Sequence, residues 1–266
     1  MPEPVAIISS GKGPPLVLLH GGTGSRSHWR RNIDALAAQF RVHALDLPGF
    51  GDAPDAPPQA TPAEYLQLIH AALASLAQEG PLRLAGFSFG GAVAAACARR
   101  LGPDCAALAL IGPGGFGSAP GRALGLRRTP PPDHPDYRAT IRHNLLALML
   151  ASPAAADDEA VDLQIANIAR SRFESRTVSL EPTLLADLAA ASAPAMAIWG
   201  EADRLAWPSV PARAELVRQA RPDIRVEIIP QAGHWAQYEN PAAVNALLLD
   251  FLTDFPTDTS NPRPRP

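Results

Sequence analysis

The segment LRLAGFSFGGAVAAACA (residues 82–98) joins an apolar run of strand length to an Ala-rich run of helical composition through a short turn. Gly86 and Gly90 flank Ser88 in this turn and give the pattern Gly-x-Ser-x-Gly. In so tight a turn flanking Cβ atoms would clash, and the serine Oγ is pushed beyond the edge of the sheet. The following helix points backbone N–H groups and its positive dipole end at the same place. Ser88 is therefore a candidate nucleophile.

Outside this segment, short apolar runs alternate with longer runs of helical period. Such alternation predicts βαβ units around a mostly parallel central sheet flanked by helices, an α/β fold. The predicted strands are 15–20, 40–47, 81–87, 105–112, 194–200 and 224–230. The predicted helices are 28–40, 61–79, 90–101, 209–220 and 241–255, with Thr61 as N-cap and Pro62 in the first turn of the second.

The alternation stops after Gly112 and returns at Pro194. Residues 113–135 are rich in Gly and Pro, and residues 136–192 have the pattern of several helices with no strand between them, so we expect a helical insertion over the sheet. The predicted division is a core domain of residues 1–112 and 193–255, the insertion at 113–192, and a disordered, Pro-rich tail at 256–266.

The overall composition is that of an ordinary soluble domain. Of 266 residues, 47% are hydrophobic and 18% charged, and the net charge is −3, which gives no reason to expect nucleic acid or an anionic membrane as partner. No apolar run is long enough for a membrane helix, and the N-terminus lacks the features of a signal peptide. We therefore expect a cytoplasmic protein. Cys97 and Cys105 are too few for a disulfide framework and are expected to be buried thiols.

A serine needs an adjacent base to become a strong nucleophile, and that base needs a third group to orient it. Of the seven histidines, His234 has the most suitable position, because it follows the last predicted strand at the carboxyl end of the sheet, where ligands bind in open α/β sheets. We expect His20 to brace the glycine-rich loop that follows it. The remaining histidines are expected to pack, to face solvent or to line a pocket: His28, His43, His70, His134 and His143.

The third group is expected on the loop after the strand at 194–200. Asp203 lies far enough along this loop to reach a histidine Nδ1, whereas Glu201 is closer to the strand end. Asp46 and Asp52 are more distant alternatives. The order Ser88, Asp203, His234 matches one of the three known orders of this kind of triad.

An oxyanion hole needs two N–H donors. Phe89, directly after the nucleophile, and Gly22, in the loop His20-Gly-Gly-Thr-Gly24, are the candidates, although glycines here could also serve only a strand-to-helix turn. The pattern Gly-x-Gly-x-x-Gly at 112–117 is followed by no helix or acidic strand end, so it does not indicate nucleotide binding. No metal-ligand spacing occurs. The sequence therefore predicts neither a cofactor nor a metal.

Five motifs together identify a family resemblance: HGGTG (20–24), DLPGFG (46–51), GFSFGG (86–91), WGEADR (199–204) and AGHW (232–235). In this order and spacing they resemble the α/β-hydrolase superfamily over roughly residues 5–255. The resemblance implies the α/β-hydrolase fold, with the helical insertion as a lid placed after the sixth strand.

Within the superfamily, DLPGFG and GHWAQYE (233–239) look like the meta-cleavage-product hydrolases, which split C–C bonds in ring-opened aromatic compounds. The chain departs from that group in having Phe87 where an Asn usually precedes the nucleophile, and Gln164 where the lid usually supplies an Arg. We expect Phe87, Trp207 and Trp235 to contact substrate, and these side chains suit an uncharged or aromatic ester.

The sequence therefore predicts a serine hydrolase that cleaves a small apolar or aromatic carboxylic ester, or a related carbonyl substrate, through a Ser88-His234-Asp203 triad. The first alternative is a C–C bond hydrolase of the meta-cleavage-product type. The second is a non-catalytic ligand-binding protein on the same fold. The expected partner is a small-molecule substrate, with no nucleic acid and no membrane, and a homo-oligomer is compatible with the sequence.

Overall fold

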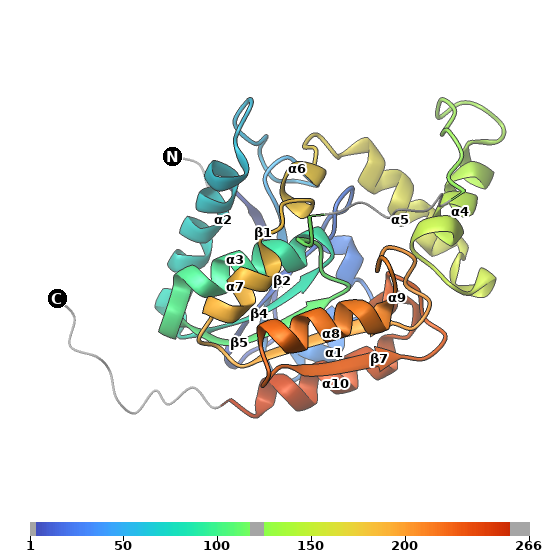
Figure 1. The fold of residues 1–266 in the computed structure, drawn as a ribbon. Coiled ribbons are helices and arrows are strands. Elements are labelled where there is room, and N and C mark those ends of the chain that lie inside the picture. The colour runs from blue at the N-terminus through green and yellow to red at the C-terminus, as the bar shows by residue number, and fades with distance from the viewer. Residues whose placement is uncertain (1–3, 118–124, 256–266) are drawn as a thin grey trace.

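The fold is built on one seven-stranded sheet, seen in a computed structural model that describes residues 4–117 and 125–255 (Figure 1). The strand order is β1-β3-β2-β4-β5-β6-β7, in which β1 is antiparallel to β3 and every other neighbouring pair is parallel. The strands are β1 (Ala6–Ser10), β2 (Pro15–Leu19), β3 (Arg41–Asp46), β4 (Leu82–Phe87), β5 (Cys105–Ile111), β6 (Ala195–Gly200) and β7 (Arg225–Ile229). The predicted mostly parallel sheet is confirmed. β1 was not predicted, because its apolar run covers only residues 5–8 and three of the five strand residues are exposed.

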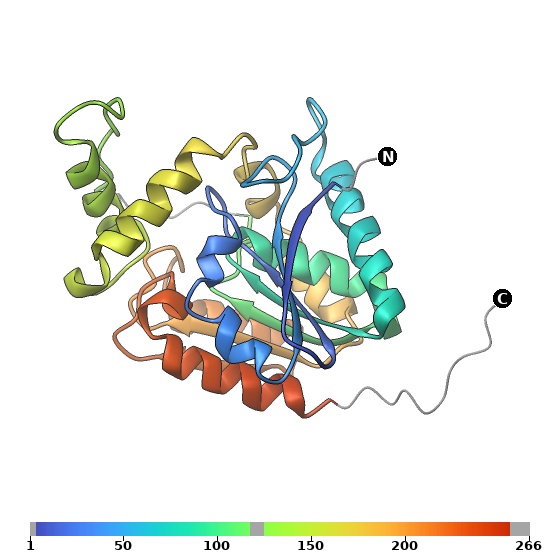
Figure 2. The same ribbon diagram turned by 180° about the vertical axis from the view of Figure 1, so that it is seen from behind.

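Helices cover both faces of the sheet. The core helices are α1 (Ile33–Ala37), α2 (Pro62–Leu76), α3 (Phe89–Leu101), α8 (Val210–Ala220), α9 (Ala236–Glu239) and α10 (Pro241–Thr253). Figure 1 shows α2, α3 and α8 in front of the sheet, and Figure 2 shows α1 and α10 on the opposite face. Each face buries its own apolar cluster, so the sheet lies in the middle of a three-layer core.

Local sequence signals explain where the helices begin. At α2, the Thr61 side chain accepts from the Glu64 N–H while the Glu64 carboxylate accepts from the Thr61 N–H, with Pro62 in the first turn. This capping box confirms the predicted start of that helix. The predicted helix at 28–40 is wrong in part: the chain forms a short 3-10 helix, η1 (Arg26–Trp29), and then α1. The break falls at buried Asn32, whose amide donates to the Gln237 carbonyl (3.0 Å).

Between β5 and β6 the described chain is helical. It contains α4 (Tyr137–Leu148), α5 (Asp158–Ala169), α6 (Arg176–Ser179) and α7 (Leu184–Ala190). α6 and α7 pack on α3, while α4 and α5 pack on each other and lie on the side of the core where α9 is found (Figure 1). The insertion was predicted after the sixth strand. It follows the fifth, β5, because the described chain before it contains only the strands β1 to β5. The predicted tail at 256–266 lies outside the described residues.

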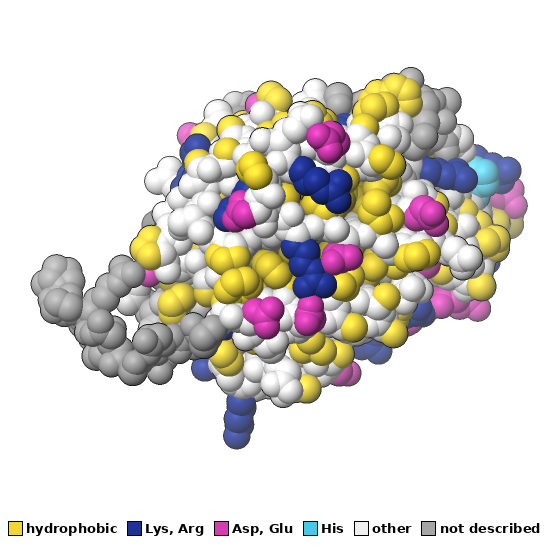
Figure 3. Space-filling model, turned by 60° about the horizontal axis from the view of Figure 1, so that its bottom comes forward, with side chains coloured by type: hydrophobic (Ala, Val, Ile, Leu, Met, Phe, Trp, Pro, Cys, Tyr) yellow, Lys and Arg dark blue, Asp and Glu magenta, His cyan; other side chains and the backbone are white. Residues whose placement is uncertain are grey.

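The surface and the cysteines agree with the composition. Side chains of both charges lie interspersed with apolar ones on the face shown in Figure 3. Cys97 and Cys105 are buried free thiols, and burial raises the pKa of each to about 12. Of the helices in the described part of the chain, none has the length and hydropathy needed to cross a bilayer.

Candidate active site

Ser88 lies on a sharp turn between β4 and α3. Its backbone has φ 52° and ψ −113°, a conformation that a non-glycine residue adopts only when the surroundings impose it. The Ser88 N–H donates to the Ile111 carbonyl of β5 (2.9 Å), which fixes the turn to the sheet. A Cβ on Gly86 would lie 2.3 Å from the Gly90 carbonyl oxygen, and one on Gly90 would lie 2.4 Å from the Leu19 carbonyl oxygen. The two glycines are therefore required by the turn that exposes Ser88.

Asp203 and His234 meet at the carboxyl ends of β6 and β7. The His234 Nδ1 lies 2.8 Å from the Asp203 Oδ2, and the Asp203 Oδ1 accepts from the Leu205 N–H (2.8 Å). Both side chains are buried: 3% of the His234 side chain and 1% of the Asp203 side chain is exposed. Since the carboxylate faces Nδ1, the neutral imidazole carries its proton there and presents an unprotonated Nε2. That Nε2 has no hydrogen-bond partner among residues 4–117 and 125–255.

Ser88 and His234 line one small cavity of about 110 Å³. The rest of the described wall comes from the loop after β5, the end of α6, the loop after β6, and α8: Gly112, Pro113, Gly114, Gly115, Phe116, Ser179, Leu180, Trp199, Asp203, Leu205, Ala206 and Arg213. The wall is mainly apolar. The structure thus brings together the three residues that the sequence singled out for a triad.

Gly112 is a site residue that the sequence analysis missed. It has φ +47°, and a Cβ on it would lie 2.9 Å from the His234 Nδ1 and 3.1 Å from the Asp203 Oδ2. Only glycine leaves room for the two side chains to meet at this point. The signal was available, since Gly112 ends a strand at the same sheet edge as the other two loops.

The two predicted oxyanion donors lie near each other. Phe89 is the first residue of α3, so its N–H has no acceptor within the helix. Gly22 follows β2, and a Cβ on it would lie 3.8 Å from the Phe89 Cβ and 2.2 Å from the Ser175 Oγ. Buried Ser175, just before α6, therefore sits directly against Gly22. The insertion thus contacts the loop that carries Gly22.

Two buried histidines shape the loop that carries Gly22. The His20 Nε2 accepts from the Leu47 N–H (3.0 Å) and its Nδ1 lies 2.8 Å from the Gly21 carbonyl oxygen, so His20 braces this loop as the sequence indicated. Burial lowers the pKa of His20 to about 4. The His28 Nδ1 accepts from the Gly21 N–H (3.1 Å), and burial holds the pKa of His28 well below its ordinary value. Both rings are therefore neutral at pH 7.

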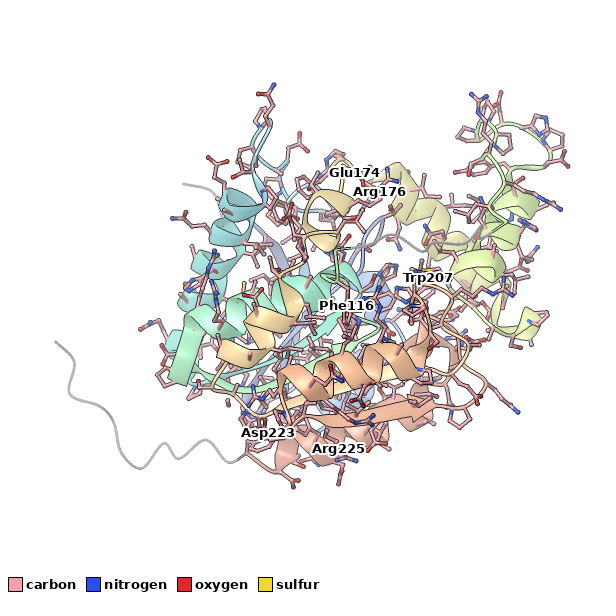
Figure 4. The ribbon with its side chains drawn as sticks, in the orientation of Figure 1. Phe116, Glu174, Arg176, Trp207, Asp223 and Arg225 are labelled. Atoms are coloured by element: carbon pink, nitrogen blue, oxygen red, sulfur yellow. The ribbon has the colours of Figure 1, made fainter. Side chains whose placement is uncertain are left out.

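The three aromatic residues predicted to contact substrate are not in the described cavity wall. Phe87 and Trp235 are fully buried behind it: the Phe87 ring lies 5.0 Å from the His234 ring, and the Trp235 Nε1 donates to the His28 carbonyl (2.9 Å). Trp207 is half-buried near the start of α8, below the insertion (Figure 4). For Phe87 and Trp235 we therefore replace the predicted substrate contact with a supporting role, because their rings are enclosed by the core.

The alternative carboxylates have other partners. Asp46 accepts from the Arg26 guanidinium and from the Arg26 and Asp52 N–H groups, and Asp52 also pairs with Arg170, the residue directly after α5. These contacts tie η1 to the insertion beside a separate cavity of about 930 Å³, whose described lining includes none of the triad residues. Within the described ranges, no group of three His, Cys, Asp or Glu side chains could hold a metal ion.

Glu239 of α9 links the insertion to the loop that carries His234. Its carboxylate accepts from the Gly233 N–H (2.7 Å), the Ser152 N–H (2.6 Å) and the Ala151 N–H (3.0 Å). The Trp235 N–H also donates to the carbonyl of Met149 (2.8 Å), which continues the same connection.

A second link to the insertion involves Arg31, which lies between η1 and α1. Arg31 pairs with Asp157 (2.7 Å) and Glu159 (2.8 Å) of the insertion, and its guanidinium carbon lies 3.7 Å from the centre of the Tyr238 ring. Arg31 and Glu239 therefore connect the insertion to the segment 233–239, which contains His234.

Comparison with known proteins places the chain in a family. A family model described as "Alpha/beta hydrolase family" matches residues 16–247. The chain is 32% identical over 90% of its length to the dihydrolipoyllysine-residue acetyltransferase component of the acetoin cleaving system of Pseudomonas putida, of which the match covers 64%. It is 28% identical over 92% of its length to a 2-hydroxy-6-oxononadienedioate/2-hydroxy-6-oxononatrienedioate hydrolase of Comamonas testosteroni, with 90% of that protein covered.

A solved structure of similar fold is the carboxylesterase CesB (YbfK) from Bacillus subtilis. It superimposes with a TM-score of 0.71 at 25% identity, over 94% of this chain and 88% of that one. The family model spans most of this chain and agrees with the sheet described above. The chain belongs to the alpha/beta hydrolase family and is an enzyme of that fold.

Proposed function

We propose that the protein is a serine hydrolase in which Ser88, His234 and Asp203 form the catalytic triad. The observation that carries this proposal is the buried His234–Asp203 hydrogen bond, whose histidine presents an unpartnered Nε2 beside the cavity that Ser88 also lines. The buried Nε2 atoms of His28 and His43 also lack a hydrogen-bond partner among the described residues, but of these three histidines His234 is the one that shares a described cavity wall with Ser88. An orphaned acceptor in a cavity is typical of a base that meets its partner in the substrate complex.

The chemistry follows from these positions. The Ser88 Oγ attacks the carbonyl carbon of the substrate while the His234 Nε2 takes its proton, and Asp203 stabilises the imidazolium that forms. The Phe89 and Gly22 N–H groups hold the negative oxygen of the tetrahedral intermediate. His234 then gives the proton to the leaving group, which departs and leaves an acyl-Ser88 ester. A water molecule, activated in the same way, releases the acid and restores Ser88.

The preferred substrate is a carboxylic ester with a short acyl group. The cavity beside Ser88 has a volume of only about 110 Å³ and a mainly apolar wall, which fits a small acyl chain. The similar fold of a carboxylesterase supports this class. Residues 113–192 serve as the lid in this proposal, because Ser179 and Leu180 close one side of the cavity and Ser175 covers Gly22.

C–C bond hydrolysis is the second candidate. It is favoured by the relative from Comamonas testosteroni, whose name states a hydrolase of 2-hydroxy-6-oxononadienedioate, over nearly the whole chain. The same triad would attack the ketone carbonyl of such a substrate. The cavity beside Ser88 is small, which favours a short acyl group, so the ester remains the first choice.

The decisive experiment combines labelling and turnover. A fluorophosphonate should modify wild-type protein and Ser179→Ala, which removes a hydroxyl from the same cavity wall, but not Ser88→Ala. Hydrolysis of p-nitrophenyl esters should fall by on the order of 10³-fold or more in Ser88→Ala.

Two results would overturn the proposal in different ways. Failure of the wild-type protein to react with fluorophosphonate would mean that the site binds ligand without a nucleophile. Rapid bleaching of a ring-fission dienol together with slow ester turnover would instead replace the ester by the C–C substrate.

A further inference from the structure

A serine of the insertion occupies the space beside Gly22. A Cβ on Gly22 would lie 2.2 Å from the Ser175 Oγ, while the nearest atom of another residue, the Phe89 Cβ, would be 3.8 Å away. Gly22 is not among the glycines with a left-handed φ, so its backbone conformation does not itself require a glycine. The missing side chain at position 22 therefore leaves room for the Ser175 hydroxyl against the loop that carries a predicted oxyanion donor.

This hydroxyl is buried and has no hydrogen-bond partner within residues 4–117 and 125–255. Only 8% of Ser175 is exposed. Ser175 is the N-cap residue of α6, yet its side chain makes no capping hydrogen bond, whereas its carbonyl accepts from the Val178 N–H (3.2 Å) and the Ser179 N–H (2.9 Å). Buried hydroxyls are normally hydrogen-bonded. An acceptor on a bound substrate would complete the pairing of this one.

Packing against the core holds Ser175 in this position. The Phe173 ring, two residues earlier, stacks on Tyr65 of α2, with the ring centres 4.1 Å apart and an interplanar angle of 11°. Glu174 and Arg176, on either side of Ser175, are exposed and pair with each other (2.9 Å), above the core in Figure 4. The segment is thus fixed on the core by an aromatic contact, and Ser175 is its inward-facing polar side chain.

We propose that the Ser175 hydroxyl is a third donor of the oxyanion hole, which joins the Phe89 and Gly22 N–H groups when the tetrahedral intermediate forms. The proposal rests on the function proposed above and adds a catalytic residue from the insertion. Bonds along the chain are about 1.5 Å long, so the separation of 2.2 Å places the Oγ within about 5 Å of the Gly22 nitrogen. Two donors that each lie about 2.9 Å from one oxygen are at most about 6 Å apart. Ser175 and Gly22 are therefore close enough to share the oxyanion.

The contribution of this hydroxyl should appear mainly in the transition state. It keeps its proton and donates to an oxygen whose negative charge grows as Ser88 attacks, so it stabilises the intermediate more than the bound ester. Ser175→Ala should therefore lower kcat for p-nitrophenyl acetate about 10- to 100-fold, the range for a hydrogen bond to a charged group, and change KM less than about threefold. Ser175→Thr keeps the hydroxyl and should recover part of this loss. Ser171→Ala removes a half-buried hydroxyl from the same segment, outside the described cavity walls, and should match the wild type.

Two further measurements separate a donor from a structural residue. Butylboronic acid forms a tetrahedral adduct with a serine Oγ, and one oxygen of this adduct would occupy the oxyanion hole. Its Ki should rise at least about tenfold in Ser175→Ala, while Tm stays within about 3 °C of wild type. The effects of Gly22→Ala and Ser175→Ala on kcat should also combine less than multiplicatively, because the Cβ added at position 22 displaces the same hydroxyl.

Three outcomes would overturn the role given to Ser175. If Ser175→Ala hydrolyses esters and binds the boronic acid as well as the wild type or better, the hydroxyl does not donate to the oxyanion, and this proposal fails while the hydrolase stands. If Ser175→Ala has a lower Tm and a raised KM but wild-type affinity for the boronic acid, the role of Ser175 is structural. If the wild type does not react with fluorophosphonate, the function proposed above fails, and this proposal fails with it.

Discussion

Replacing Glu239 with alanine tests whether the link between the insertion and the loop that carries His234 supports activity. The change removes a carboxylate that accepts three backbone N–H groups, from Gly233, Ser152 and Ala151. The first of these lies directly before His234 and is buried, whereas Ala151 is exposed and Ser152 half-buried. Water can therefore replace the carboxylate at two of the three donors but not at Gly233.

The expected cost follows from this difference. Leaving the buried Gly233 N–H without a partner costs about 1–3 kcal/mol, and the two hydrated donors add about 0.5 kcal/mol each, giving a loss of about 2–4 kcal/mol in the free energy of unfolding. For a chain of this length, each kcal/mol lowers Tm by about 2–4 °C, so a fall of roughly 5–15 °C is expected. Loosening the loop should also displace His234, and a displacement of about 1 Å can lower kcat about 100-fold.

The assay compares thermal melting with ester turnover. Glu239→Ala and Glu239→Gln should both melt earlier and show kcat about 10- to 100-fold below wild type, with KM changed less than kcat. Glu215→Gln, an exposed residue of α8, is the matched control and should resemble wild type. If Glu239→Ala melts within about 2 °C of wild type and retains full kcat, the link between these two segments carries neither stability nor positioning.

Two other substitutions test buried groups. The pKa of His20 is 6.5 in the unfolded chain and about 4 in the folded protein, so between these pH values the unfolded state binds more protons. The free energy of unfolding therefore has its full value above pH 6.5 and falls by about 3 kcal/mol as the pH drops to 4. Urea unfolding across this range should show a weaker pH dependence in His20→Gln, but an unchanged one in exposed His134→Asn; parallel curves for wild type and His20→Gln would contradict this account. Gly112→Ala should lower kcat on the order of 100-fold, because its Cβ would press on the His234 ring, whereas Gly102→Ala, with φ +55° and open space around it, should cost only about 1 kcal/mol of stability. Equal kcat values for the two alanine variants would refute a steric role for Gly112.

Much of the fold could be predicted because the central strands are short, fully buried apolar runs separated by helical periods. The edge strand β1 was not predicted, since three of its five residues are exposed. Its strand conformation depends on the hydrogen bonds to β3, which the local sequence does not indicate. The helix predicted at 28–40 was interrupted because burial of Asn32 and its bond to a distant carbonyl override local propensity.

In the candidate site, too, some contacts could be predicted from the sequence and others could not. Loop positions at the strand ends predicted that Asp203 and His234 meet, and the hydrogen bond of 2.8 Å confirms the contact, while their catalytic role stays a prediction. Arg213 and Glu239 could not be found in this way, because sequence spacing does not say which side of a helix faces a cavity or a loop. Aromatic character suggested substrate contact for Trp235, but tertiary packing encloses that ring.

The contacts of Glu239 set a rule for protein engineers who exchange insertions between members of this family. A grafted segment in place of residues 113–192 brings its own N–H donors at positions 151 and 152. The carboxylate that accepts from them, on Glu239, still belongs to the recipient protein and lies more than 80 residues later in the sequence. Chimeras that transfer the insertion together with the segment 233–239 should keep their turnover. Those that transfer the insertion alone should fold with His234 displaced and should lose turnover.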